Sequence, residues 1–200
     1  MPLHIFEQRY RDMVADSIDS GQWIGMVVLA PGWEDQYYGR PNILPIGCAG
    51  NIEKWTRHDD GKYDIVLRGQ SRFRVIRELG ETSYRQAEVD LLEPIQDQQL
   101  ENGNPLKERL MSRYREFTQL LPEKNPQKVN PDLSECRTLS EVIDRLAFLF
   151  DLTFEERWQF LQEPDVVKRY QSLLTVIDMK IKIVQRSATM NQFNVDFRMN

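Results

Sequence analysis

The chain has 200 residues, of which 40% are hydrophobic and 28% charged, so it is neither a disordered nor a fibrous protein. Its 26 basic and 31 acidic residues give a net charge of −5, which argues against tight binding to nucleic-acid phosphates. Two cysteines, Cys48 and Cys136, lie far apart without metal-site spacing, a pattern typical of a reducing compartment. No long apolar run and no signal-like start is present, so we expect a cytoplasmic protein without membrane contact.

The first half of the chain predicts one helix followed by strands. Apolar residues at helical spacing indicate a helix that Gly21 ends. Two short apolar runs, residues 23–30 and 43–52, favour buried strands. Gly47 and Gly50 inside the second run are typical of a bulge, a tight bend or a close backbone approach. These features are those of a small, strongly curved barrel.

The rest of this half predicts further strands. Asp60-Gly61, between two extended runs, is a hairpin signal because both residues tolerate positive φ. The returning strand, residues 63–68, alternates between apolar and polar side chains, and Gly69-Gln70 predicts a second turn. A last alternating strand covers residues 87–91.

In the second half the apolar period changes to that of helices. Residues 106–121 form one apolar helical face, and Thr138–Glu141 and Thr153–Glu156 are capping boxes that open two more helices. We expect the second box to open a helix with Phe154, Trp158 and Leu161 facing inward. A long apolar stripe over residues 167–184 predicts a last helix.

This pattern divides the chain into two parts. We expect a barrel over residues 1–95, a polar linker over 96–105, a helical part over 106–187 and a loose tail over 188–200.

A search for catalytic and metal-binding patterns finds none. The only Gly-Lys pair, Gly61-Lys62, lacks the other residues of a phosphate-binding loop. His4 and His58 are isolated in the sequence from both cysteines. A fold could unite them, but packed or solvated histidines are the more common case, so we predict no metal site. The acidic pairs at residues 34–35 and 59–60 lie in turn-like loops, where solvated carboxylates are common. We therefore predict no catalytic residue, no metal and no cofactor.

Aromatic residues give the one candidate binding site. Trp33, Tyr37 and Tyr38 stand in a polar loop, and strand pairing would bring Trp55 near them. Exposed Trp and Tyr side chains bind peptides well, because they combine large area with few rotatable bonds. In the alternative interpretation, the loop folds back over the barrel and buries these rings.

Several motifs occur in the order found in one family. They are Pro2-Leu3-His4-Ile5-Phe6-Glu7-x-Arg9-Tyr10, Ile46-Gly47-x-x-Gly50-x-Ile52, Asp60-Gly61, Ile65-x-Leu67-x-Gly69-x-x-Arg72-Phe73-Arg74-Val75, Leu152–Arg157 and Val166–Tyr170. With these motifs the chain resembles, over nearly its whole length, the N-terminal substrate-recognition domain of Lon proteases. The resemblance implies an α+β fold: a PUA-like pseudo-β-barrel with one helix, followed by an all-α helical bundle.

The same resemblance implies a function. It predicts a non-catalytic module that binds unfolded polypeptide or a partner protein, because the ATPase and Ser-Lys protease domains of Lon lie further along those chains. Family members usually carry a strand upstream of the Pro-Leu-His motif, so we expect the natural product to extend beyond Met1. The oligomeric state stays open.

Two other functions compete with this one. PUA-like barrels elsewhere bind RNA, and Arg68, Arg72 and Arg74 could form a basic strip, although the acidic charge of the chain disfavours this function. An enzyme of another type would need a deep pocket with two titratable groups of opposed pKa shifts.

Overall fold

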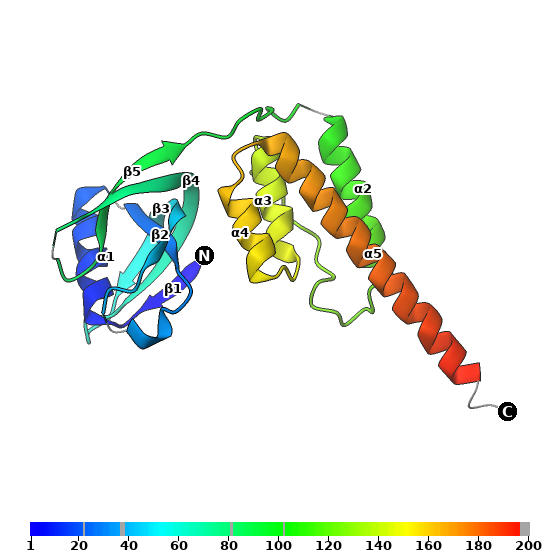
Figure 1. The fold of residues 1–200 in the computed structure, drawn as a ribbon, viewed down its shortest axis with the longest axis horizontal. Coiled ribbons are helices and arrows are strands. Elements are labelled where there is room, and N and C mark those ends of the chain that lie inside the picture. Colours follow the sequence, from blue (N-terminus) through cyan, green and yellow to red (C-terminus); the bar gives the residue numbers. More distant parts are fainter. Residues whose placement is uncertain (22, 37–38, 81, 102, 197–200) are drawn as a thin grey trace. The chain divides into compact units, whose positions relative to one another are not determined.

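The computed structural model of the chain describes residues 1–21, 23–36, 39–80, 82–101 and 103–196, with side chains up to residue 187. The chain forms two compact units (Figure 1). The first, Met1–Glu93, is called the β unit below, and the second, Pro94–Asn200, the helical unit. Together they give the α+β fold that the sequence predicted.

The β unit contains an antiparallel sheet in which the described strands are ordered β1-β4-β3-β2, with β5 also paired to β4. Its elements are β1 (Pro2–Ile5), α1 (Gln8–Ser20), β2 (Trp23–Leu29), the short 3₁₀ helix η1 (Glu34–Gln36), β3 (Ile43–Arg57), β4 (Tyr63–Leu79) and β5 (Gln86–Leu92). The first half of β4 pairs with β1 and its second half with β5, while β3 runs along its other edge. One long bent strand therefore connects both parts of the sheet.

Helix α1 ends as its sequence predicts. Gly21 adopts φ 118°, a left-handed conformation that suits glycine, and its N–H donates to the carbonyl of Ser17. The helix buries Val14 against the sheet core. That core is apolar and consists of Ile5, Val14, Ile24, Ile52, Tyr63, Ile65 and Leu67.

The glycines of β3 are sites of close approach, as predicted. A Cβ on Gly47 would lie 2.6 Å from the carbonyl oxygen of Met26 and would overlap the ring of Phe73. A Cβ on Gly50 would lie 2.9 Å from the carbonyl oxygen of Arg68. Only a residue without a side chain lets the strands pack this tightly.

The β3–β4 hairpin is confirmed at Gly61, which has φ +79° and donates its N–H to the carbonyl of His58. The second turn expected at Gly69-Gln70 is wrong, because β4 runs unbroken through both residues. Gly50 pairs with Gly69 and Ala49 with Ser71, so Gln70 is the extra residue of a β-bulge. A glycine in a strand weakens the ladder locally, and here that leads to a bulge rather than a reversal.

Of the two strands that pair with opposite halves of β4, β1 was not expected and β5 was. Pro2–Ile5 was not predicted as a strand, yet it pairs with residues 63–66 of β4. The apolar residues of β5 alternate as expected, but Val89 and Leu91 remain 36% and 58% exposed. Alternation shows which side chains share a face of a strand, and tertiary packing decides whether that face is covered.

The helical unit contains α2 (Pro105–Leu120), α3 (Leu139–Leu149), α4 (Phe154–Gln162) and α5 (Val166–Asp196). Both predicted capping boxes are present: Thr138 with Glu141 opens α3, and Thr153 with Glu156 opens α4. Helices α2 and α3 pack on α5 (Figure 1). Their shared core includes Phe117, Leu139, Ile143, Leu146 and Leu173.

Some boundaries and faces in this unit differ from the expected ones. Phe154 is 51% exposed, and Phe160 is the buried aromatic residue of α4. Helix α5 continues to Asp196, beyond the expected end at 187, because no Gly or Pro interrupts this part of the sequence. Among the described residues, no helix is both long and apolar enough to cross a membrane.

The segment expected as a linker makes ordered contacts with the helical unit. The N–H of Leu100 donates to the carbonyl of Arg137 at 2.8 Å, and the carboxylate of Asp97 accepts from the N–H of Ser140 at 3.0 Å. Leu100 also packs against the helical core. At least the first half of residues 96–105 therefore lies along this unit.

Candidate functional site

A hollow of about 430 Å³ lies across strands β1, β4 and β3 of the β unit. Three cross-strand rows line it: Pro2, Val66 and Lys54; Leu3, Ile65 and Trp55; His4, Asp64 and Thr56. Five of the nine lining residues are apolar, and His4, Asp64, Lys54 and Thr56 are the polar ones. Such a composition suits an apolar group of a ligand that is oriented by a few polar contacts.

The register of β3 brings Trp55 into this hollow. Ile52 pairs with Leu67 and Lys54 with Val66, so Glu53 is the extra residue of a bulge. After the bulge, Trp55 lies opposite Ile65, which is 2% exposed and belongs to the core. Trp55 itself remains 46% exposed. The hollow therefore combines a buried apolar base with a large aromatic side chain that a ligand can still cover.

A group of polar side chains adjoins the hollow, and we call it the His–Asp cluster: His4, His58 and Asp64. Nδ1 of His4 lies 2.7 Å from one carboxylate oxygen of Asp64, and Nε2 of His58 lies 2.7 Å from the other. These hydrogen bonds lower the pKa of Asp64, the bond with His4 contributing most. Asp64 is consequently a stable carboxylate at neutral pH.

The four aromatic residues predicted as a peptide site have different positions. Trp55 lines the hollow. Trp33 is half-buried in the turn before η1, where its carbonyl accepts the N–H of Gln36 at 3.0 Å, and it is not among the lining residues. Tyr37 and Tyr38 lie outside the described residues. A joint site of all four residues stays a prediction.

The fold brings the two histidines together, a possibility that the sequence left open. His4 is directly opposite Asp64 in the β1–β4 ladder, and the rings of His4 and His58 lie 6.2 Å apart between centroids. The predicted hairpin could have indicated the approach of His58 to Asp64. His4 could not be placed in the cluster this way, because no strand was predicted at residues 2–5. Its partner Asp64 also lies about 60 residues away in the sequence.

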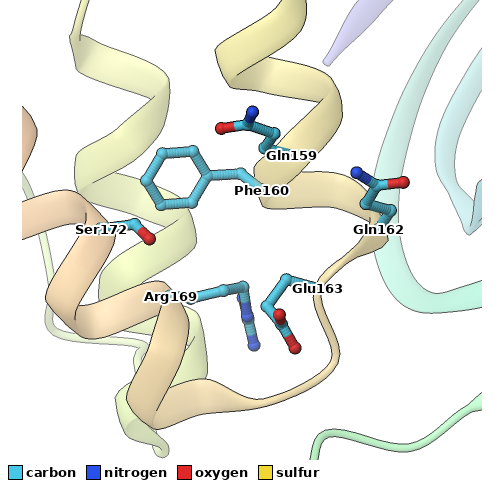
Figure 2. A pocket seen from close by; sticks show the side chains of 6 residues that line it. All are labelled: Gln159, Phe160, Gln162, Glu163, Arg169 and Ser172. Carbon is cyan, nitrogen blue, oxygen red and sulfur yellow. The ribbon is translucent and has the colours of Figure 1, made fainter.

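The helical unit has a hollow of about 400 Å³ between the end of α4 and the first turns of α5 (Figure 2). Arg169 borders it but is only 1% exposed. Its guanidinium donates to the carboxylate of Asp144 and, at 2.6 Å, to the hydroxyl of Ser140. These bonds tie α5 to α3, which makes Arg169 a structural residue of the helical unit.

Comparisons with known proteins agree with this architecture. Residues 1–178 match the model of the protein family described as the ATP-dependent protease La (LON) substrate-binding domain. The crystal structure of a Lon N-terminal domain protein from Xanthomonas campestris is similar, with a TM-score of 0.60 and 27% identity over 88% of both chains. The N-terminal domain of a Mycobacterium avium complex Lon protease has the same fold, with a TM-score of 0.55, 18% identity and coverage of 89% of this chain and 90% of that one.

Full-length Lon proteases are also related. Lon protease 2 of Myxococcus xanthus is 25% identical over 94% of this chain, and Lon protease of Anaeromyxobacter dehalogenans is 23% identical over the same share. The chain spans 22% of the length of each of these relatives. The fold and the family match together define a domain of the substrate-binding type. The chain belongs to the family of Lon substrate-binding domains.

Proposed function

We propose that this chain is a non-catalytic module that binds exposed apolar segments of unfolded polypeptide, with the hollow around Trp55 as its binding site. The supporting observation is a half-exposed tryptophan over an apolar, strand-lined hollow in a member of a substrate-binding family. Cys48 and Cys136 are not joined by a disulfide, which suits action in the reducing cytoplasm.

The size and surroundings of the hollow fit a peptide side chain. A volume of about 430 Å³ is within the usual range of roughly 300–1,000 Å³ for ligand sites. Other large apolar side chains of the β unit are also exposed, among them Phe6 at 60%, Ile76 at 49% and Leu91 at 58%. Exposed apolar side chains in this number favour binding of polypeptide segments.

The carboxylate of Asp64 in the hollow does not favour an enzyme. Asp64 has a lowered pKa because His4 and His58 hydrogen-bond to it, which is opposite to what a general acid needs. The chemistry of the hollow is therefore better suited to binding than to proton transfer.

The arginines of the β unit do not favour RNA as the ligand. Arg68 pairs with Glu53 at 3.1 Å and Arg77 pairs with Glu88 at 2.6 Å, so carboxylates offset charges that an RNA backbone would need. The net charge of −5 acts in the same direction.

The test measures binding of reduced, carboxymethylated α-lactalbumin, a permanently unfolded chain, by fluorescence anisotropy, with native α-lactalbumin as the folded comparison. Trp55→Ala is the site variant. Trp23→Ala is the matched control, since Trp23 is 54% exposed in the same unit but does not line the hollow.

The exposed area of Trp55 sets the size of the effect. With 46% exposure of a side chain that can bury roughly 250 Å², about 100 Å² is available. At about 25 cal/mol per Å² this is worth at most about 2.5 kcal/mol, or roughly 60-fold in affinity. We expect Trp55→Ala to weaken binding between about 5- and 60-fold, and Trp23→Ala to leave it within twofold. Equal losses in both variants, or equal binding of native and unfolded lactalbumin, would refute the proposal.

A further inference from the structure

The His–Asp cluster has the ligands of a transition-metal site. Its three ligand atoms, one from each of His4, His58 and Asp64, lie within 4.8 Å of one another. These three residues are the one such group found among the described residues. The chain contains two histidines in total, and both are in this cluster.

The sheet register fixes the cluster, so it does not depend on a chance approach of long surface side chains. In the ladder, β4 Asp64 pairs with His4 of β1 on one side and with Thr56 of β3 on the other. His58 is two residues beyond Thr56 and therefore points to the same face, as a diagonal neighbour of Asp64. The carbonyl of Lys62 accepts the N–H of His58 at 2.9 Å, which holds the backbone of the hairpin end in place.

The side chains have the freedom that metal binding needs. His4, His58 and Asp64 have side-chain exposures of 55%, 42% and 55%. Because Zn–N and Zn–O bonds are about 2.0–2.2 Å long, ligand atoms up to 4.8 Å apart need small side-chain rotations to reach one ion.

We propose that His4 Nδ1, His58 Nε2 and a carboxylate oxygen of Asp64 bind one divalent transition-metal ion of the Zn²⁺ class. Two imidazole nitrogens select zinc, copper or nickel over Mg²⁺ and Ca²⁺, which prefer oxygen ligands. Asp64 supplies a negative charge toward the ion, and the exposed side of the cluster leaves its remaining positions to water. The bound ion would connect β1, the β3–β4 hairpin and β4 next to the hollow.

The experiment titrates the purified 200-residue chain with Zn²⁺ by isothermal calorimetry, with Mg²⁺ as the comparison ion. His58→Gln and Asp64→Asn are the site variants, both at exposed positions, and circular dichroism checks that each is folded. Asp59→Asn is the matched control, because it removes the same charge one residue from His58 but lies outside the cluster. Hydrogen-bond partners behind metal ligands alone contribute about 10–100-fold to affinity, so loss of a direct ligand should weaken Zn²⁺ binding by at least about tenfold.

A second readout tests the ligands themselves. Nuclear magnetic resonance of the imidazole nitrogens should show both histidine rings shifting together with one equivalent of Zn²⁺, and Co²⁺ should give no thiolate charge-transfer band. Three outcomes would overturn the proposal: no Zn²⁺ binding, binding that is equally strong in Asp64→Asn and Asp59→Asn, or a cobalt spectrum that shows Cys48 or Cys136 as the ligand.

Discussion

The close packing at Gly47 leads to a specific prediction for Gly47→Ala. The new Cβ would lie 2.6 Å from the carbonyl oxygen of Met26 and would overlap Phe73, which is 3% exposed. Met26 cannot move away freely, since it and its neighbour Val27 pair with Cys48 and Gly47 in the β2–β3 ladder. Overpacking usually costs about 1–3 kcal/mol, and contact with backbone puts this variant at about 3 kcal/mol.

Gly25→Ala is the matched control for this effect. Its Cβ would lie 3.2 Å from the same Phe73 ring and contact no backbone atom, so a small shift of the ring can accommodate it. The lower entropy of the unfolded chain offsets about 0.4–1 kcal/mol of any strain, so we expect near-neutral stability. Adding Phe73→Leu to Gly47→Ala should recover only part of the loss, because the contact with the carbonyl of Met26 remains.

Urea unfolding followed by tryptophan fluorescence measures the effect. Three of the four tryptophans, at positions 23, 33 and 55, lie in the β unit, so the signal reports mainly on that unit. With an m-value of roughly 1–3 kcal/mol per M, a loss of about 3 kcal/mol lowers the midpoint by about 1 M or more. If the midpoints of Gly47→Ala and Gly25→Ala agree within error, the argument from close packing is wrong.

Three further predictions concern the helical unit. Thr138→Ala should destabilise it by about 1 kcal/mol in thermal unfolding followed at 222 nm, because the capping box of α3 is lost, whereas Thr138→Ser should cost little. Asp144→Ala should cost about 3 kcal/mol in the same assay by removing a carboxylate from the buried guanidinium of Arg169, and Asp144→Asn should cost less. The N–H of Ser134 lowers the pKa of Asp132 below 3.8, so this carboxylate contributes stability above pH 3.8 that is lost as pH falls through the lower folded value. Asp132→Asn should therefore flatten the pH dependence, below pH 3.8, of the urea midpoint followed by circular dichroism at 222 nm, and an unchanged slope would contradict this.

The sequence itself predicted the local features of the fold. Gly21 and Gly61 end a helix and turn a hairpin because both need positive φ, a constraint that a single residue carries. Thr138 and Thr153 open helices because each cap is completed within four residues. The order of such motifs also indicated the family, which the match over residues 1–178 confirms.

The candidate site depended on pairings that no local pattern contains. The meeting of His4 with Asp64 joins residues about 60 positions apart through a strand that the sequence did not predict, so the cluster was missed. A turn was expected at Gly69-Gln70, where the structure has a bulge at Gln70. A glycine in a strand indicates weak pairing but does not specify whether the chain turns or bulges there.

Trp55 shows the same division between sequence and structure. The sequence marked it as a large aromatic side chain able to bind a peptide, which is a property of the residue alone. Trp55 lies opposite Ile65 on the neighbouring strand and keeps 46% of its surface exposed. Both facts follow from the bulge at Glu53 and the register of three strands. Residue chemistry and short-range backbone preferences are thus fixed by sequence, whereas register and burial arise when distant strands pair, and these created both the hollow and the His–Asp cluster.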